Sequence, residues 1–138
     1  MKRFELLDHT ADTGIIAYGR DLKDVFCNAA YGMFSIIADL RLVKGTKEID
    51  IAVSGLDLYG LLVAWLSELL YYQSVKNILF SQFNIDEMDE KRLKGRAYGE
   101  VCDKTRHELK TEIKTVTYHQ LKIEEIRGIW RIQVIFDI

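Results

Sequence analysis

Two segments of the chain have the hydrophobic spacing of buried α-helices. In residues 22–37, hydrophobic side chains recur at steps of one, three and four residues, which places them on one helix face. Asp21 directly precedes this segment and predicts an N-cap, with Asp24 three residues later. A second, more hydrophobic helix is predicted from residue 58 to about residue 72, with Asp57 as its N-cap. Both hydrophobic faces are predicted to lie in the core.

Most of the remaining chain has the alternation or the short hydrophobic runs of β-strands. Strands are predicted at residues 3–8, 13–19, 49–53, 78–85, 96–102, 112–118, 121–125 and 129–138. Residues 86–94 are predicted to form a hairpin tip, and residues 103–110 one or two helical turns. This order predicts an α+β fold, a two-layer sandwich in which two main helices pack on a mixed, mostly antiparallel sheet.

Composition limits the domain count and the classes of partner. A chain of 138 residues with 49% hydrophobic residues suits one domain, residues 1–138, with one core. Nineteen basic and twenty-one acidic residues give a net charge of −2, so no overall positive field attracts nucleic acid or an anionic membrane. Hydrophobic runs are too short to span a membrane and no signal core follows the N-terminus, which predicts a cytoplasmic protein. Cys27 and Cys102 are predicted to be free thiols.

Candidate chemistry is concentrated in residues 8–14 and at the end of the chain. Two acids, a histidine and a hydroxyl occur within five positions between two hydrophobic runs, a pattern that also suits a plain polar turn. In the last predicted strand, Asp137 faces away from Phe136 and adjoins the terminal carboxylate of Ile138. Such hard oxygen donors suit Ca²⁺ or Mg²⁺. If Asp12 and the terminus meet, a cation would relieve their repulsion; otherwise Asp137 is a solvated chain end.

The three histidines add less. His9 follows an acid and is interpreted either as an acid–base group or as a hydrogen-bonded turn residue. His107 is predicted to lie on the surface, and His119 follows a strand-like stretch that includes Lys114. The sequence contains no hydrolase triad, phosphate-binding loop, dinucleotide fingerprint or zinc-spaced cluster, so it gives little support for nucleophilic catalysis.

Four motifs make the chain resemble a known family. They are DHTADTGI at residues 8–15, GRDL at 19–22, HELKTEIKTVTYHQL at 107–121 and VIFDI at 134–138. Together they closely resemble the archease family, over residues 8–138. The resemblance implies a protein that is not itself an enzyme but activates the RtcB-type tRNA-splicing RNA ligase. Such activators promote guanylylation of the ligase, allow its multiple turnover and broaden its nucleotide use in tRNA splicing.

The resemblance also implies a set of functional residues. Asp12, Asp137 and Ile138 match the family's divalent-cation site, with Ca²⁺ ahead of Mg²⁺ as its occupant. The matched functional surface comprises Asp8, His9, Lys114 and His119. The implied partner is the ligase, with tRNA associated only indirectly and no membrane. The chain departs from the family at Gln120, where many members have Gly, and at Lys104-Thr105, where many have Pro.

Two alternative functions are compatible with the sequence. A general protein chaperone would bind unrelated unfolded proteins through a large exposed hydrophobic patch, of which the sequence gives no clear sign. An autonomous metal-dependent phosphoesterase would use Asp8, His9 and Asp12 and would turn over without a partner.

Overall fold

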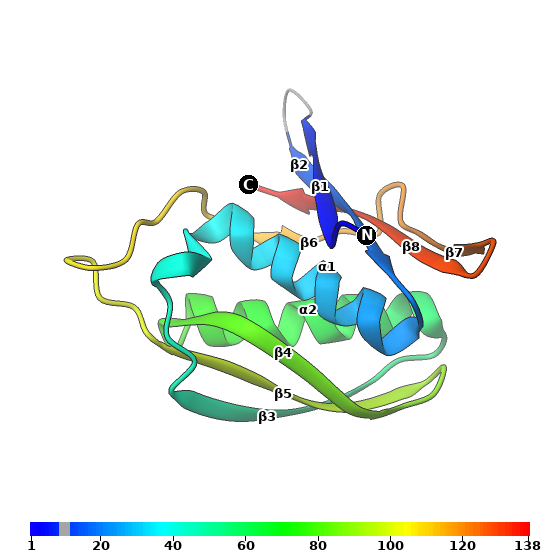
Figure 1. Ribbon diagram of the computed structural model, residues 1–138, viewed down its shortest axis with the longest axis horizontal. Coiled ribbons are helices and arrows are strands. Elements are labelled where there is room, and N and C mark those ends of the chain that lie inside the picture. Colours follow the sequence, from blue (N-terminus) through cyan, green and yellow to red (C-terminus); the bar gives the residue numbers. More distant parts are fainter. Residues whose placement is uncertain (9–11) are drawn as a thin grey trace.

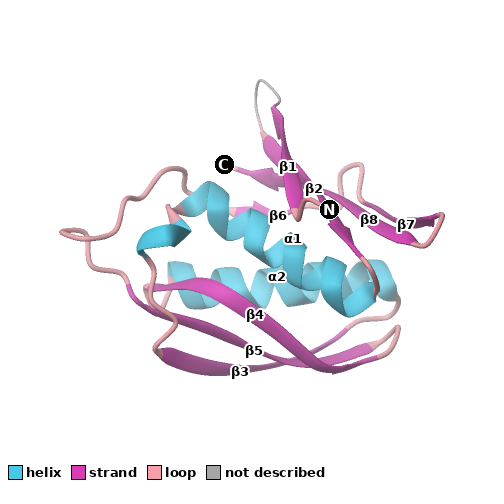
Figure 2. Ribbon diagram, in the orientation of Figure 1, coloured by secondary structure: helices cyan, strands magenta, loops and turns pink. Residues whose placement is uncertain are grey.

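The computed structural model describes the whole chain except residues 9–11 and the side chain of Asp8. Two helices, α1 (Leu22–Ile37) and α2 (Leu58–Ser74), lie between two antiparallel sheets, one above them and one below in the view of Figure 1. Figure 2 shows the same layers by element type. The predicted α+β class, with two main helices packed on mostly antiparallel strands, is confirmed; the strands divide into two sheets that share the helix pair.

The larger sheet combines the two ends of the chain, and the smaller one is built from the middle. In the larger sheet the strand order is β1-β2-β8-β6, and β7 also pairs with β8. Its strands are β1 (Phe4–Asp8), β2 (Thr13–Gly19), β6 (Thr115–Val116), β7 (Lys122–Ile126) and β8 (Ile129–Asp137). The smaller sheet has the order β3-β5-β4, formed by β3 (Lys47–Ser54), β5 (Arg92–Val101) and β4 (Ile78–Met88). A short 3₁₀ helix, Leu40–Leu42, links α1 to β3.

Both predicted N-caps are confirmed. The Asp21 side chain accepts a hydrogen bond from the Asp24 N–H at 2.8 Å, and Asp57 accepts one from the Gly60 N–H at 2.8 Å. These bonds satisfy amides at the helix starts that have no partner within the helix. The caps therefore fix where each helix begins relative to the strand before it.

The core lies where the two helices meet and where they pack on the sheets. Trp65 of α2 is fully buried, and its Nε1–H donates to the carbonyl oxygen of Phe26 in α1 at 3.0 Å. Phe34 of α1 packs edge-on against Phe80 of β4, with 5.5 Å between ring centroids. Large hydrophobic side chains of this kind each contribute about 1.5–3 kcal/mol on burial. The packing holds both sheets against the same helix pair.

The predicted one or two helical turns at 103–110 narrow to a single turn at 103–107, closed by the His107 N–H and the Asp103 carbonyl at 2.7 Å. Two other local predictions need correction. The predicted strand 112–118 shortens to Thr115–Val116. His107 is buried rather than on the surface, because Glu100 and the Asp103 amide supply its ring with hydrogen bonds.

Other predictions are confirmed or narrowed. Cys27 and Cys102 are free thiols. The hairpin tip between β4 and β5 is three residues long, 89–91, because both strands run further than predicted. Within the described part of the chain, no helix has the length and hydrophobicity that a membrane crossing requires.

Candidate functional site

Strands from the two halves of the chain pair in the larger sheet, where β2 lies beside β8, the last strand (Figure 1). β8 lies between β2 on one side and β6 on the other, and the pairing of β2 with β8 sets Thr13 opposite Phe136. This pair is the last of the β2–β8 ladder, with Asp12 directly before Thr13 and Asp137 directly after Phe136. The two acids thus share one end of the sheet.

Asp137 is also tied to the other neighbour of β8. Thr115 of β6 pairs with Asp137, and its hydroxyl donates to an Asp137 carboxylate oxygen with 3.2 Å between the oxygens. The backbone N–H of Lys114 donates to the Asp137 carbonyl oxygen at 2.7 Å. The Asp137 and Lys114 side chains are both exposed. The last strand residue is therefore held by its backbone while its carboxylate faces solvent.

The burial pattern of β8 keeps this end polar. Phe136 is fully buried in the core, so Asp137 points to the outer face, as the alternation of the last segment predicts. Ile138 follows with 43% of its surface exposed, which adds the terminal carboxylate beside the Asp137 side chain. Asp12 is half-buried and directly precedes β2. The three carboxylates predicted as cation ligands thus come from adjoining positions.

His119 lies in a turn that follows β6 along the outside of β8. Its N–H donates to the Thr117 hydroxyl at 3.2 Å, and Thr117 bonds the Ile135 carbonyl oxygen through both its N–H and its hydroxyl. The side-chain amide of Gln133 in β8 donates to the Gln120 carbonyl oxygen at 3.0 Å. His119 is exposed, and these bonds fix the turn that carries it next to β8.

The backbone conformation at Gln120 bears on one departure from the pattern of the resembled family, in which many members have Gly at this position. Its backbone has φ of 53°, in the left-handed region that favours glycine. The turn therefore keeps the geometry that a glycine would adopt freely, and a side chain is accommodated there at a conformational cost. The departure affects the turn next to His119 and leaves the predicted cation ligands unchanged.

Part of the predicted site lies outside the described structure. The backbone of Asp8 pairs with Thr13 at the end of β1, which brings residue 8 to the same end of the sheet as Asp12. The side chain of Asp8 and the whole of His9 are outside the described residues. Their roles stay predictions from the sequence.

Few side chains in the described structure are placed to hold a metal ion. No three His, Cys, Asp or Glu side chains converge in the described part of the chain to hold a metal ion. The predicted site needs only two such side chains, Asp12 and Asp137, with the terminal carboxylate as the third donor. An all-oxygen, anionic donor set of this kind matches the preference of Ca²⁺ and Mg²⁺. The residues present thus fit a hard divalent cation.

One residue of the site was missed from the sequence. Thr115 appears there only as part of an alternating polar stretch, whereas the structure makes it the hydrogen-bond donor to Asp137. The only signal is its position directly after Lys114, in a strand whose partner could not be known.

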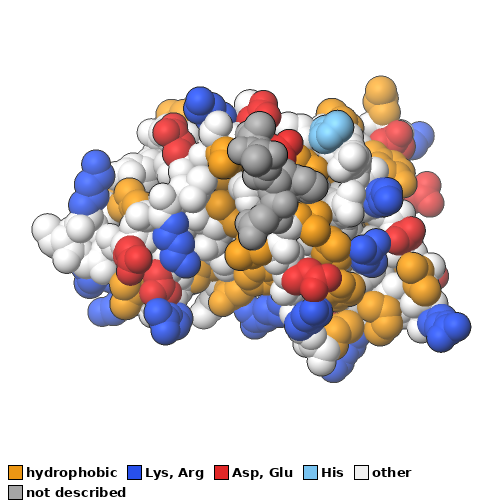
Figure 3. Space-filling model, turned by 90° about the horizontal axis from the view of Figure 1, so that it is seen from above, with side chains coloured by type: hydrophobic (Ala, Val, Ile, Leu, Met, Phe, Trp, Pro, Cys, Tyr) orange, Lys and Arg blue, Asp and Glu red, His pale blue; other side chains and the backbone are white. Residues whose placement is uncertain are grey.

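Seen from above, this face of the molecule mixes acidic, basic and hydrophobic side chains, and no single-sign patch dominates what is visible (Figure 3).

Comparisons with known proteins agree with the fold. The family model described as the archease protein family matches residues 4–138. A protein archease of Methanosarcina mazei is 43% identical over 141 residues, covering 99% of this chain and 97% of its own. A solution structure of a Methanobacterium thermoautotrophicum protein has a TM-score of 0.85 and 42% identity, with full coverage of both chains. An archease crystal structure from Thermotoga maritima, described as a possible chaperone, shares the fold with a TM-score of 0.66, 19% identity and coverage of 96% and 94%.

Proposed function

The chain belongs to the archease family, and on that premise we propose that it activates an RtcB-type tRNA-splicing RNA ligase. It would promote guanylylation of the ligase, sustain multiple turnover and broaden nucleotide use. It would act as a cofactor protein of the ligase, without catalysing the joining itself. Its association with tRNA would be indirect, through the ligase, and we place this activity in the cytoplasm.

The observation that carries this proposal is the strand register at the end of the larger sheet. Thr13 pairs with Phe136 and Thr115 with Asp137, which supports the proposal that Asp12, Asp137 and the terminal carboxylate act together at this end of the sheet. The exposed side chains of Lys114 and His119 border the same strand, β8. Such an end offers oxygen donors and a cationic group to a partner whose substrate carries phosphates.

The residues of this chain would contribute by holding a cation and charged groups in fixed places, without taking part in bond making or breaking. Asp12, Asp137 and the terminal carboxylate would hold a divalent cation, Ca²⁺ first and Mg²⁺ as the alternative, which when bound supplies positive charge for phosphate oxygens. Thr115 would keep one Asp137 oxygen in a fixed direction through its hydrogen bond. The ammonium group of Lys114 would contact an anionic group of the partner. The backbone hydrogen bond from Lys114 to Asp137 would fix the position of Lys114 relative to Asp137.

The test is guanylylation of a purified ligase by GTP, with this protein at substoichiometric amounts. We expect the parent to stimulate the reaction and the Asp12→Asn and Asp137→Asn variants to lose stimulation by about tenfold or more, because each loses an anionic oxygen. Asp50→Asn is the matched control, since Asp50 is an exposed acid of β3 in the other sheet. A folded Asp12→Asn protein that stimulates as well as the parent would contradict the proposal.

Two further assays address the alternative functions. A general chaperone would suppress aggregation of an unrelated client protein at stoichiometric amounts, and that effect would survive Asp137→Asn. A phosphoesterase would hydrolyse p-nitrophenyl phosphate with added Ca²⁺ or Mg²⁺ and no ligase. Either result, together with no stimulation of an active cognate ligase, would replace the activator function.

A further inference from the structure

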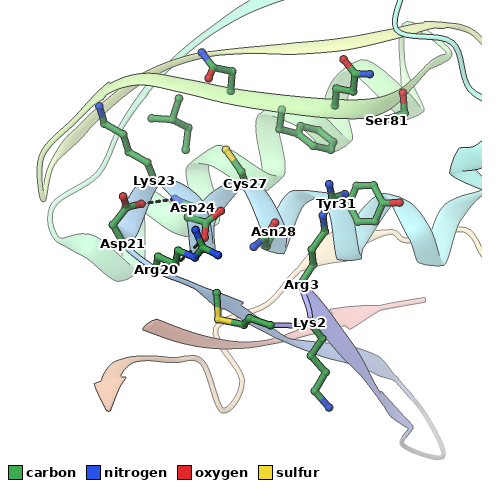
Figure 4. Close-up of a pocket in the computed structure, with 15 residues that line it drawn as sticks. Lys2, Arg3, Arg20, Asp21, Lys23, Asp24, Cys27, Asn28, Tyr31 and Ser81 are labelled. Atoms are coloured by element: carbon green, nitrogen blue, oxygen red, sulfur yellow. Dashed lines mark hydrogen bonds between the residues drawn. The ribbon is translucent and has the colours of Figure 1, made fainter. Parts of the chain in front are cut away.

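A polar groove of about 730 Å³ runs along the outer face of α1, away from the residues discussed above. Its floor is formed by four half-buried residues at helical spacing on one side of α1, Asp24, Cys27, Asn28 and Tyr31. The N-terminal residues, including Arg3, form one wall, and β4 forms the other. In Figure 4 the side chain of Cys27 points from α1 toward β4, and Arg3 extends toward Tyr31.

The groove has an excess of positive charge. Four basic side chains and two acidic side chains line it. Arg3, Arg20 and Lys23 have no carboxylate within ion-pair distance among the residues that the structure describes. The Arg3 guanidinium lies 4.5 Å from the centre of the Tyr31 ring, and the Lys23 ammonium donates to the Asp86 carbonyl oxygen at 2.9 Å. These contacts hold two cations along the groove without neutralising them.

The two acidic side chains of the groove each accept a hydrogen bond from a backbone amide of the chain itself. Asp21 accepts the Asp24 N–H at 2.8 Å as the cap of α1, and Asp24 accepts the Arg20 N–H at 2.9 Å. Figure 4 shows both bonds as dashed lines. Because these oxygens face the start of the helix, they do not satisfy the guanidinium of Arg3 or the ammonium of Lys23. The groove therefore favours an anionic ligand.

The wall formed by β4 is the free edge of the smaller sheet. Among the residues that the structure describes, β4 pairs only with β5 in the order β3-β5-β4, and the Cys27 thiol of α1 contacts the Ile85 backbone on the other side of β4. The pairing shifts register between Phe80 and Gln82 and again between Ile85 and Glu87, so irregularities at Ser81 and Asp86 bracket a regular stretch, 82–85. This stretch lines the groove. A free strand edge offers backbone donors and acceptors that an extended peptide can pair with.

We propose that this groove binds an extended, acidic polypeptide segment of a partner protein, which adds as a strand to β4 between Ser81 and Asp86. Its carboxylates would lie against Arg3, Arg20 and Lys23, and its backbone would pair with the free edge. A nucleic-acid strand would use the cations but has no backbone amides to pair with β4, so the strand edge favours a peptide. The inference does not depend on the proposed activation of a ligase, because it uses no residue from the Asp137 end of the larger sheet.

The first test measures binding of a fluorescein-labelled peptide of four Glu-Val repeats by fluorescence anisotropy at low salt. We expect saturable binding to the parent, weakened about tenfold in the triple variant Arg3→Gln, Arg20→Gln, Lys23→Gln, because three exposed charge contacts are lost. The matched control replaces three basic residues that also lack ion pairs in the described structure, Lys104, Lys122 and Arg127, each with Gln. It should bind within about twofold of the parent.

The second test separates strand addition from simple charge attraction. Two further peptides carry N-methyl groups on all valine amides or on all glutamate amides. At least one should lose binding, because methylation removes the amides that pair with a strand edge. Hydrogen exchange at the backbone amides of residues 82–85 should slow when the unmethylated peptide is bound.

Four outcomes would overturn the proposal. They are no saturable binding of the Glu-Val peptide, binding of both methylated peptides as tight as that of the unmethylated peptide, equal binding by the groove variant and its control, or tighter binding of a uridine oligonucleotide of equal charge than of the peptide. Urea unfolding of both triple variants checks that they are folded.

Discussion

The hydroxyl of Thr115 and the carboxylate of Asp137 are joined by a hydrogen bond of 3.2 Å across the β6–β8 pair. Both side chains are exposed, so the bond contributes little to the stability of the fold. Its effect is to restrict the directions that one Asp137 oxygen can take. Thr115 can thus orient the carboxylate of Asp137, the residue proposed as a cation ligand.

Replacing Thr115 with Val should separate these two effects. The change keeps the branched shape and removes the donor, so we expect cation affinity to fall about tenfold while the free energy of unfolding changes by less than about 0.5 kcal/mol. Isothermal titration with Ca²⁺ and urea unfolding measure the two quantities. Thr46→Val, at an exposed position before β3, is the control and should leave both unchanged. Equal Ca²⁺ affinity of the Thr115 and Thr46 variants would contradict the orienting role.

The turn that carries His119 should gain stability from a glycine. Gln120 has φ of 53°, which costs a residue with a side chain about 1–2 kcal/mol, whereas glycine adopts it freely but is more flexible when unfolded. We expect Gln120→Gly to raise the free energy of unfolding by about 0.5 kcal/mol. Gln120→Ala, which keeps the same backbone penalty, should change it much less. Urea unfolding of the three proteins distinguishes these results, and a destabilised glycine variant would contradict the argument.

His107 should matter for stability although it was predicted to be a surface residue. Its Nδ1 accepts the Asp103 N–H at 2.8 Å, so the ring proton lies on Nε2 and is donated to Glu100 at 3.0 Å. Replacing His107 with Ala removes a buried ring and both of its hydrogen bonds, and should lower the free energy of unfolding by about 2–3 kcal/mol. His119→Ala, in an exposed turn, should change it by less than about 0.5 kcal/mol. Similar losses in the two variants would contradict this assignment.

Glu100 should make the fold sensitive to acid. Hydrogen bonds from the Arg106 guanidinium, the Lys44 amide and His107 hold the pKa of Glu100 below its ordinary value of 4.5. A lowered carboxylate pKa stabilises the fold above the ordinary pKa, and this contribution disappears as the pH falls through the folded-state pKa. The stability difference between the parent and Glu100→Gln should therefore be largest near neutral pH and shrink below about pH 4.5.

Urea unfolding of both proteins between neutral and acidic pH measures this difference. The control is Glu90→Gln at the exposed β4–β5 hairpin tip, whose difference from the parent should stay small throughout. A difference between the parent and Glu100→Gln that grows as the pH falls would have the wrong sign.

Cys27 should be an unreactive thiol. Burial, together with the nearby carboxylate of Asp24, raises the pKa of Cys27 to about 12, so only roughly 0.01% is thiolate at pH 8. In a Cys102→Ser background, alkylation by iodoacetamide should be at least roughly 100-fold slower in the folded protein than in concentrated urea. The folded-state rate should keep rising with pH well beyond the ordinary thiol range. Equal rates in the folded and unfolded protein would show that Cys27 is accessible and has a normal pKa.

The helices could be predicted from the sequence because their signals are local. Asp21 and Asp57 cap the first turns of α1 and α2 through bonds to residues three positions later, and one helix face repeats every few residues. The division of the strands into two sheets has no local signal. It depends on which hydrophobic strand faces which side of the helix pair, and every strand has the same alternation in either sheet.

For the candidate site, the sequence predicts which residues belong to it but not how they are arranged in space. Asp12 and Asp137 are noticeable from their position and chemistry, but nothing local places them at the same end of the sheet, since the register is set by the whole β2–β8 pairing. His107 was misjudged for a similar reason. A histidine in a charged stretch is usually exposed, and its burial depends on Glu100 in β5 and on the path of the following segment.

The pairing of β2 with β8 joins strands from opposite ends of the chain, while β3, α2, β4 and β5 follow one another without interruption. Closing so long a loop costs chain entropy that short-range contacts do not, so we expect the middle of the chain to form its sheet first. The chain contains no proline, so a slow phase in a refolding experiment would reflect this topology and not prolyl isomerisation. Because the candidate cation ligands come together only through the last pairing to form, a partly folded chain would have the smaller sheet without the proposed ligand set.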